Sequence, residues 1–422
     1  MTWPHVPPRR TPPQRRVLGR VGAVAATLLA VESTGCDREA ASFGVVPPDT
    51  ADVPVVLSPE PAWGTGSGWR VAEEPSVVIG VEQGPPEYQF FGAQGALILP
   101  DGRIAVANSG TGELRFFDPR GRFVGSVGRQ GQGPGEFSER STLDMWLSAD
   151  SLIAVTDNGS RRINLFDLSG RHLSTVRFAS APGGLVPRPR AGFDDGTWLG
   201  WVNSGALDGQ AGEVIRSVMV YFRFLRDGGL EGEVFRHEGQ PRFVNQVGSR
   251  VHYPFIPLSP APLVATDGTR VLFLPGPTRE IRVLEGVGGP TARYRWGEGR
   301  LRLAGEVYGR YKEESLKEMG PGETFRRYAR FYDQDLPIPE HLPCCQSLVV
   351  DALGYIWVER YRLPWEGDPR WDVLDASGRW LGSVGTPTGL NVIQVGADFV
   401  LGSAADSLGV ERIVVYTLSK RP

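Results

Sequence analysis

Cysteine and histidine are scarce in this chain of 422 residues, which holds 3 of the first and 5 of the second. Four histidines lie beyond the first 35 residues, and no two have a metal-ligand spacing such as H-x-x-x-H: His172, His237, His252 and His341. A single histidine is usually a hydrogen-bonded structural residue. We therefore expect no metal site from local spacing, although side chains distant in the sequence could still meet at one point.

Long helical stretches are also rare, and there is no excess of basic charge. The 55 glycines and 35 prolines are typical of many short strands joined by tight turns. Hydrophobic residues make up 41% and aromatic residues 10%, which is enough for a sizeable core. The 45 basic and 48 acidic residues argue against nucleic acid as a partner, because phosphate binding needs a basic surface.

The apolar run 21–31 is too short to span a bilayer comfortably, since that takes about 20 residues. It follows five arginines and precedes Ser33-Thr34-Gly35-Cys36. This order resembles the signal peptide and lipobox of bacterial lipoproteins, with Ser33 where those proteins usually have leucine. The resemblance implies that residues 1–36 direct export and that Cys36 is lipidated and anchors the protein to a cell-envelope membrane. The alternative is an ordinary signal peptide followed by an unrelated cysteine.

Residues 37–68 are rich in proline, glycine, serine and acidic residues and show little periodicity. We interpret this segment as a flexible tether between the anchor and the folded domain, 69–422.

One pattern recurs six times in residues 69–422. An apolar strand, a turn with Asp or Gly and a second apolar strand are followed by a polar loop, a third strand, another turn and a fourth strand. The first turns of the copies lie at Asp101-Gly102, Asp150-Ser151, Asp195-Gly196, Asp267-Gly268, Ala352–Gly354 and Gly396–Asp398. Because a single four-stranded blade cannot cover both of its faces, six copies predict an all-β, six-bladed β-propeller.

The sixth copy has only three strands, which end near residue 418. A strand-like segment, 69–80, precedes the first copy and can supply the missing fourth strand. We therefore predict that 69–80 pairs with 412–418 and closes the ring, which removes open sheet edges.

The linker after the first copy carries the clearest family resemblance. Its residues, 123–128 followed by Gly131-Gln132-Gly133-Pro134-Gly135-Glu136-Phe137, resemble the repeat-linking signature of NHL-type propellers. Asp157-Asn158, Arg162-Ile163 and Phe166-Asp167 match the same repeat further along. The chain is thus similar to bacterial six-bladed propeller lipoproteins of the NHL-repeat-like group over about 69–420, and the match is clean in the first, second and fifth copies.

The strand pattern breaks at residues 300–342, between the fourth and fifth blades. Apolar residues recur there at spacings of 3, 4 and 5, with charged residues between them, which predicts an amphipathic helix between Leu301 and Met319. An aromatic and basic stretch, Phe325 to Tyr332, follows. This helical insertion is interpreted either as a loop packed on the propeller or as a lid or partner-binding element over the channel mouth.

Ligand recognition in a propeller belongs to its longer loops. Loops from the second to the third strand lie on the same face as the linkers between blades, and they supply the binding-face candidates: Asn108, Asp157, Asn203, Arg279, Arg360 and Trp365. Acidic residues also recur at the short turns of the opposite face: Asp101, Asp150, Asp195 and Asp267. Their regular placement favours turn formation over calcium binding, although a channel metal such as calcium is not excluded.

Cys344 and Cys345 are adjacent. In an oxidising compartment they could form a vicinal disulfide and a rigid kink before the fifth blade. The alternative is a pair of small, buried, reduced residues.

These observations favour a non-catalytic binding propeller at the cell envelope, without a predicted cofactor. The expected partners are an envelope protein, a peptide or a glycan, and the membrane through the lipid anchor, but not nucleic acid. The alternative is a channel-centred hydrolase or lyase, similar to propeller lactonases, with or without a metal.

Overall fold

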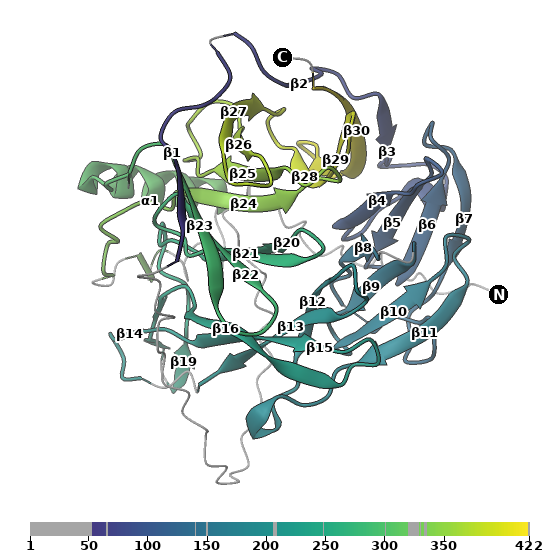
Figure 1. The fold of residues 1–422 in the computed structure, drawn as a ribbon, viewed down its shortest axis with the longest axis horizontal. Helices are drawn as coiled ribbons and strands as arrows, with labels where there is room; N and C mark the ends of the chain where they lie inside the picture. The colour runs from purple at the N-terminus through teal and green to yellow at the C-terminus, as the bar shows by residue number, and fades with distance from the viewer. Residues whose placement is uncertain are drawn as a thin grey trace, which may run out of the picture.

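The computed structural model describes residues 53–420, apart from 65, 140, 149–150, 206–208, 248, 300, 320–328, 330 and 333–335. The expected signal peptide, Cys36 and the first half of the expected tether lie outside these residues. Six sheets of four or five strands stand in a ring around a common centre (Figure 1). The predicted all-β six-bladed propeller is confirmed.

Each of the first three blades is a four-stranded antiparallel sheet whose strands are ordered as in the chain. Blade 1 comprises β4 (Gly95–Ile98), β5 (Ile104–Asn108), β6 (Glu113–Phe117) and β7 (Phe123–Val127). Blade 2 comprises β8 (Met145–Leu147), β9 (Ile153–Asp157), β10 (Arg162–Phe166) and β11 (His172–Arg177). Blade 3 comprises β12 (Arg188–Gly192), β13 (Trp198–Ser204), β15 (Val218–Phe224) and β16 (Leu230–Glu238).

The other three blades repeat this arrangement. Blade 4 comprises β20 (Leu263–Thr266), β21 (Arg270–Leu274), β22 (Glu280–Glu285) and β23 (Pro290–Trp296). Blade 5 comprises β24 (Cys345–Val350), β25 (Ile356–Arg360), β26 (Arg370–Leu374) and β27 (Trp380–Gly385). Blade 6 comprises β28 (Asn391–Val395), β29 (Phe399–Ala405) and β30 (Glu411–Ser419) together with an N-terminal strand segment. Two small hairpin-like sheets lie outside this ring: β14 (Val214–Ile215) with β17 (Arg242–Phe243), and β18 (Asn245–Val247) with β19 (Arg250–His252).

Six apolar clusters form the core of the ring, and each one joins two neighbouring blades. The middle strands carry most of it, because both of their faces meet another blade. In β5 and β9, for example, every residue is buried. Such strands begin with a run of apolar residues instead of alternating, and end in a buried polar residue at Asn108 and Asp157. The blade-to-blade apolar contacts are present at all six boundaries.

The ring is closed by N-terminal residues, as the sequence predicts. β2 (Arg70–Val71) and β3 (Val77–Ile79) both pair antiparallel with β30. Ile79 is buried in the cluster between blades 6 and 1. The segment 69–80 therefore supplies the fourth strand of blade 6, and this prediction is confirmed.

The second half of the expected tether differs from the prediction. β1 (Val55–Ser58) pairs in parallel with β23 as a fifth strand of blade 4. The backbone N–H groups of Ala62 and Trp63 then donate to the carbonyls of Trp380 and Leu381 on β27. Residues 53–68 are thus a strap across the outer edges of blades 4 and 5 instead of a free linker. The composition of this segment does not predict β1, because a strand added at the edge of a sheet is held by backbone hydrogen bonds and needs no apolar pattern.

The short turns between first and second strands use aspartate as a hydrogen-bond acceptor. The Oδ1 atoms of Asp101, Asp195 and Asp267 each accept the backbone N–H two residues later. Glycines with positive φ follow them at 102, 196 and 268. At these three positions the prediction of turn formation is confirmed, whereas Asp150 lies outside the described residues.

The helix of residues 300–342 is α1 (Gly305–Met319), which follows β23 and precedes β24 in the chain. Its buried Tyr308 and Tyr311 pack with Leu258 and with Leu363 in the loop after β25. Figure 1 shows α1 at the left edge of the molecule, across the ring from β5 and β9. The expectation of a lid over the channel mouth is therefore wrong, because α1 lies at the rim, away from Asn108 and Asp157, and its apolar side is occupied there. Most of the stretch Phe325 to Tyr332 lies outside the described residues.

Candidate functional site

The loops from the second to the third strand and the linkers between blades share one face of the ring, because adjacent strands of a blade are antiparallel. We call it the loop face. The longer loops and the linker 128–137 all lie there. In that linker Gly128 has φ +86, and a Cβ on it would meet the ring of the buried Phe137 at 2.9 Å. The linker is therefore held tightly against the core, and other segments must provide an open site.

Asn108 ends β5 on the loop face and is fully buried. Its Oδ1 accepts the backbone N–H of Phe91 at 2.7 Å, and its Nδ2 donates to the hydroxyl of Thr111 at 2.9 Å. The side chain thus ties the incoming linker to the loop after β5. It organises the loop and is not available to a ligand.

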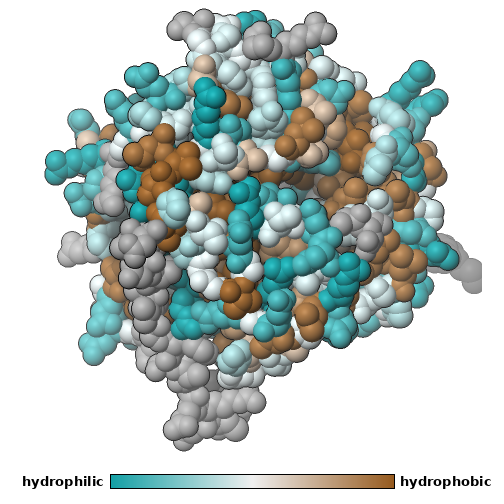
Figure 2. Space-filling model, in the orientation of Figure 1, coloured by the Kyte–Doolittle hydropathy of each residue, from teal (hydrophilic) through white to brown (hydrophobic). Residues whose placement is uncertain are grey.

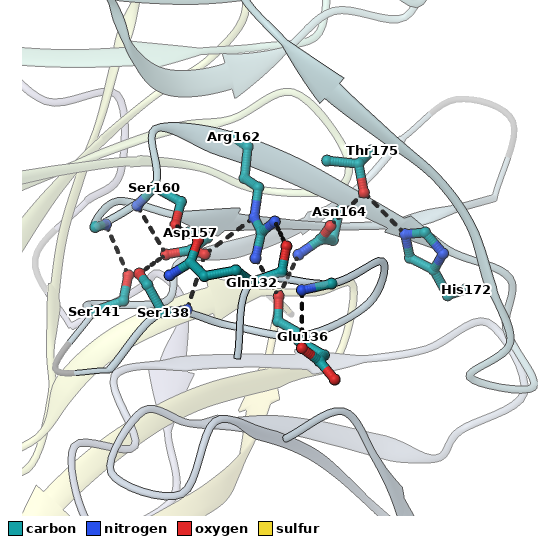
Figure 3. Close-up of polar contacts among 12 residues, drawn as sticks. Gln132, Glu136, Ser138, Ser141, Asp157, Ser160, Arg162, Asn164, His172 and Thr175 are labelled. Carbon is teal, nitrogen blue, oxygen red and sulfur yellow. Dashed lines mark hydrogen bonds and ion pairs between the residues drawn. The ribbon is translucent and has the colours of Figure 1, made fainter. Parts of the chain in front are cut away.

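Asp157 holds the corresponding position in blade 2, and Figure 3 shows its surroundings. It accepts the backbone N–H of Ser138 at 3.0 Å and the Ser138 hydroxyl, and its Oδ2 pairs with Arg162 Nε at 3.1 Å. Arg162 also donates to the carbonyls of Gln132 and Glu136 in the linker. Burial opposes ionisation of Asp157, but the hydrogen bonds from Ser138, Ser141 and the Ser160 backbone together outweigh it, so the pKa of Asp157 lies below its usual value. Asp157 is a buried anchor for the linker.

Arg279 and Arg360 meet at a buried aspartate between blades 4 and 5. Asp372 accepts from Arg360 Nη2 at 2.7 Å and from the indole N–H of Trp296 at 3.1 Å. Arg279 Nε lies 4.0 Å from the Asp372 carboxylate. The Ser383 hydroxyl also donates to Asp372, at 2.8 Å. Both arginines are therefore committed to internal charge compensation.

The remaining two candidates lie apart from these groups. Asn203 is exposed near the end of β13. Trp365 is half-buried, and the guanidinium of Arg310 lies 4.3 Å from the centre of its ring. The structure thus spreads the six predicted residues over the loop face of blades 1 to 5, with Arg360 and Trp365 both in blade 5, and it brings only Arg279 and Arg360 together at one side chain.

Two histidines singled out by their scarcity have internal partners. His172 contacts the Thr175 hydroxyl at 3.1 Å, as Figure 3 also shows. His237 Nδ1 lies 2.8 Å from the carbonyl of Glu238. Within the described residues, no group of three or more His, Cys, Asp or Glu side chains is placed to hold a metal ion.

Cys344 and Cys345 are buried thiols at the boundary of blades 4 and 5, with 2.7 Å between their Sγ atoms. The Cys344 thiol donates to the carbonyl of Thr278 at 3.2 Å. Burial, followed by the neighbouring Cys344 thiol, raises the pKa of Cys345 well above its usual value. The two thiols are close enough to be joined by oxidation. The vicinal disulfide between Cys344 and Cys345 stays a prediction.

An open hollow of about 610 Å³ lies on the loop face where blades 6, 1 and 2 meet. Four separate segments line it: Val81–Glu82 with Gln89–Gly92, Ser109–Gly110, Ser141–Thr142, and Leu408–Glu411. Sequence reasoning missed it because these segments are far apart in the chain. The available signal was an apolar residue directly before glycine in a loop, at Phe91-Gly92 and Leu408-Gly409.

The hollow combines apolar and acidic groups. Phe91 is 58% exposed and Leu408 is 68% exposed, although both are large apolar side chains. Figure 2 shows that apolar residues are interspersed with polar ones on the side of the molecule that it depicts. Glu82 and Glu411 are the charged residues among the lining residues of the hollow. One Glu411 oxygen accepts the N–H of Ala93 at 2.9 Å, which fixes the orientation of this carboxylate.

A family model described as a 6-bladed beta-propeller, DUF5128, matches residues 91–211. Among curated proteins no sequence matches the chain. A solved structure of a DUF4221 member from Bacteroides vulgatus is 10% identical, with a TM-score of 0.48, over 84% of this chain and 99% of that one. A Bacteroides fragilis protein described as exported is 11% identical, with a TM-score of 0.44, over 87% and 100%.

The virginiamycin B lyase of Staphylococcus aureus is also similar to this chain, at 10% identity and a TM-score of 0.38 over 83% of this chain and 99% of that one. At these values the solved structures carry no argument about activity. No helix in the described part of the chain is long and apolar enough to cross a membrane.

Proposed function

We propose that this protein is a non-catalytic binding module and that the hollow between blades 6, 1 and 2 binds a basic, partly apolar segment of a partner polypeptide. The observation that carries the proposal is the exposure of Phe91 and Leu408 beside two carboxylates. Large apolar groups that stay exposed at a concave, polar-rimmed site are typical of interaction sites.

The chemistry of the hollow favours a cationic ligand group. Glu82 and Glu411 contribute negative charge, and the lining residues include no lysine or arginine. A Lys or Arg of the partner would pair with these carboxylates, while its apolar neighbours cover Phe91 and Leu408. Burying an exposed side chain of this size contributes about 1.5–3 kcal/mol.

The hydroxyl groups of the hollow are used for structure. Ser109 Oγ accepts the N–H of Leu143 at 3.2 Å, and Ser141 Oγ accepts the N–H of Gly159 at 2.9 Å. The lining residues include no histidine that could act as a general base for either hydroxyl. These contacts support binding over nucleophilic catalysis at this site.

The basic start and the apolar run before Cys36 support an extracytoplasmic location for this module. We therefore place the propeller at the cell envelope, held by a lipidated Cys36, with an envelope protein or peptide as partner. A glycan is the competing ligand class.

The test is site-specific photocrosslinking in cells. A photoreactive amino acid replaces Leu408, and a matched control replaces Leu353, which is 57% exposed on the short turn between β24 and β25 of the opposite face. We expect a discrete crosslinked polypeptide from position 408 that is lost when Glu82→Lys or Phe91→Ala is added. Equal products from both positions, or products unaffected by these changes, would overturn the proposal. If instead the purified protein binds glycans on an array and Phe91→Ala abolishes this binding, the ligand of the hollow is a glycan and the proposed polypeptide partner is wrong.

A further inference from the structure

Two arginines lie close together on the loop face at the boundary of blades 2 and 3, and neither is among the residues that line the hollow. Arg161 ends the loop before β10, and Arg188 is the first residue of β12. Arg161 Nη1 donates to the carbonyl of Val186 at 3.2 Å, which brings its guanidinium to the linker two residues before Arg188.

Arg188 is held by its surroundings while remaining exposed. Its guanidinium lies 5.4 Å from the centre of the Trp201 ring, and Trp201 is its register partner on β13. Pro187 and Pro189 flank it, and their fixed φ angles stiffen the backbone on both sides. The guanidinium is therefore preorganised, because an aromatic face supports it from one side.

Neither guanidinium has a counter-ion in the described part of the chain, where no carboxylate lies within 4.0 Å of Arg161 or Arg188. Other arginines of the same face differ, since Arg162 pairs with Asp157 and Arg360 with Asp372. Burial and the charge of Arg161 lower the pKa of Arg188. The two positive charges thus repel each other without compensation.

The backbone of Arg161 adds an independent observation. Its φ is +51, in the left-handed region that disfavours side chains. The same position in blade 1, directly before β6, is Gly112 with φ +68. An arginine at a position suited to glycine costs roughly 1 kcal/mol, and such local strain is typical of functional positions.

We propose that Arg161 and Arg188, supported by Trp201, form a binding subsite for an oxyanion: a carboxylate, phosphate or sulfate group of a ligand on the loop face. The guanidinium groups would donate charge-assisted hydrogen bonds to it. The bound anion would also relieve the repulsion between the two arginines. Neither arginine lines the hollow, so the two sites can be tested separately.

The test measures anion binding to the purified protein by calorimetry and thermal unfolding, with sulfate, phosphate and acetate at constant ionic strength. We expect saturable binding to the wild type. Arg188→Gln should weaken it roughly tenfold or more, because a hydrogen bond to a charged group contributes about 1.5–3 kcal/mol. Comparison of acetate with sulfate and phosphate decides between a carboxylate and a tetrahedral anion.

Arg161→Gly separates charge from folding, because glycine relieves the strained φ while removing the guanidinium. We expect this variant to lose anion affinity while its melting temperature in chloride is maintained or raised. The matched control is Arg122→Gln, whose side chain is 74% exposed on the opposite face. Sulfate stabilises proteins in general, so only the difference from this control counts.

The proposal is overturned if the Arg161→Gly, Arg188→Gln double variant keeps the wild-type response, or if Arg122→Gln loses as much. Phe91→Ala should leave anion binding unchanged. A negative crosslinking result at position 408 would therefore overturn only the partner site in the hollow, and a negative anion-binding result would overturn only the arginine subsite.

Discussion

Polar residues at the loop-face ends of the second strands, buried at Asn108 and Asp157 and half-buried at Arg360, hold the loops of this propeller in place. Asn108 in blade 1 and Asp157 in blade 2 occupy the same position, and Arg360 occupies it in blade 5. Each one binds backbone or a charged partner within its own blade or linker. A polar residue in a polar loop therefore proves to be part of the scaffold at these positions.

We expect Asp157→Asn to lower the free energy of unfolding by about 3–5 kcal/mol at neutral pH, because Arg162 is left as an uncompensated buried charge. The pKa of Asp157 is lowered in the folded state, so its stabilising contribution is present above the unfolded pKa of about 3.9 and is lost as the pH falls through the folded pKa. Denaturant titrations of wild type and variant should differ by a constant amount from pH 7 to about 5, and by less below about pH 4.

The matched control for this pair is Asp398→Asn, an exposed aspartate at the turn between β28 and β29. It should change the free energy of unfolding by less than about 0.5 kcal/mol. An Asp157→Asn variant that behaves like this control at every pH would contradict the structural role of Asp157.

At the scale of elements, the N-terminal strap and the strands β2 and β3 that follow it reach three blades in succession. β1 extends blade 4, Ala62 and Trp63 bind β27 of blade 5, and β2 and β3 complete blade 6. Trp63 lies against Gly382, where a Cβ would meet its ring at 2.3 Å. The strap covers edges that would otherwise offer unpaired N–H and C=O groups.

Stepwise deletion should separate the contribution of the strap from that of β2 and β3. Removing residues 1–68 takes away β1 and Trp63 but leaves the ring closed, so we expect a melting temperature lowered by a few degrees, on a scale of about 2–4 °C per kcal/mol. Removing residues 1–80 also takes away Ile79 and opens β30, and should cost at least about 5 °C more. A chain lacking only residues 1–52 is the control, and identical melting of all three would rule out this role.

At the scale of the molecule, the ring could be predicted from the sequence because its repeats share one pattern and each blade needs two neighbours. The closing strand 69–80 could also be predicted, since the sixth copy lacks a fourth strand. The hollow could not, because it forms only when loops from three blades meet. The sequence alone predicts ligand-binding roles for Asn108 and Asp157, because the sequence of a polar loop does not reveal that a side chain in it is buried.

The anchor assigned to Cys36 is tested on the whole molecule. Cys36→Ala should leave the protein exported but without lipid, because the thiol that carries the lipid is absent. Mass spectrometry of the membrane fraction measures the attached mass. Cys344→Ala is the control and should keep the lipid, whereas a Cys36→Ala protein that is still lipidated would refute the assignment.

The pairing of β3 with β30 also sets an order of events during synthesis. Val77 leaves the ribosome early, but its partner Val415 follows only after all the strands of the first five blades. Until then, β2 and β3 have no edge to join, and a partly made chain exposes the apolar sides of blades 1 and 5. Loop closure between such distant segments is slow relative to local hairpin formation. The unclosed ring is therefore the species that a cell must protect from aggregation, and any premature stop before β30 leaves the chain permanently in that state.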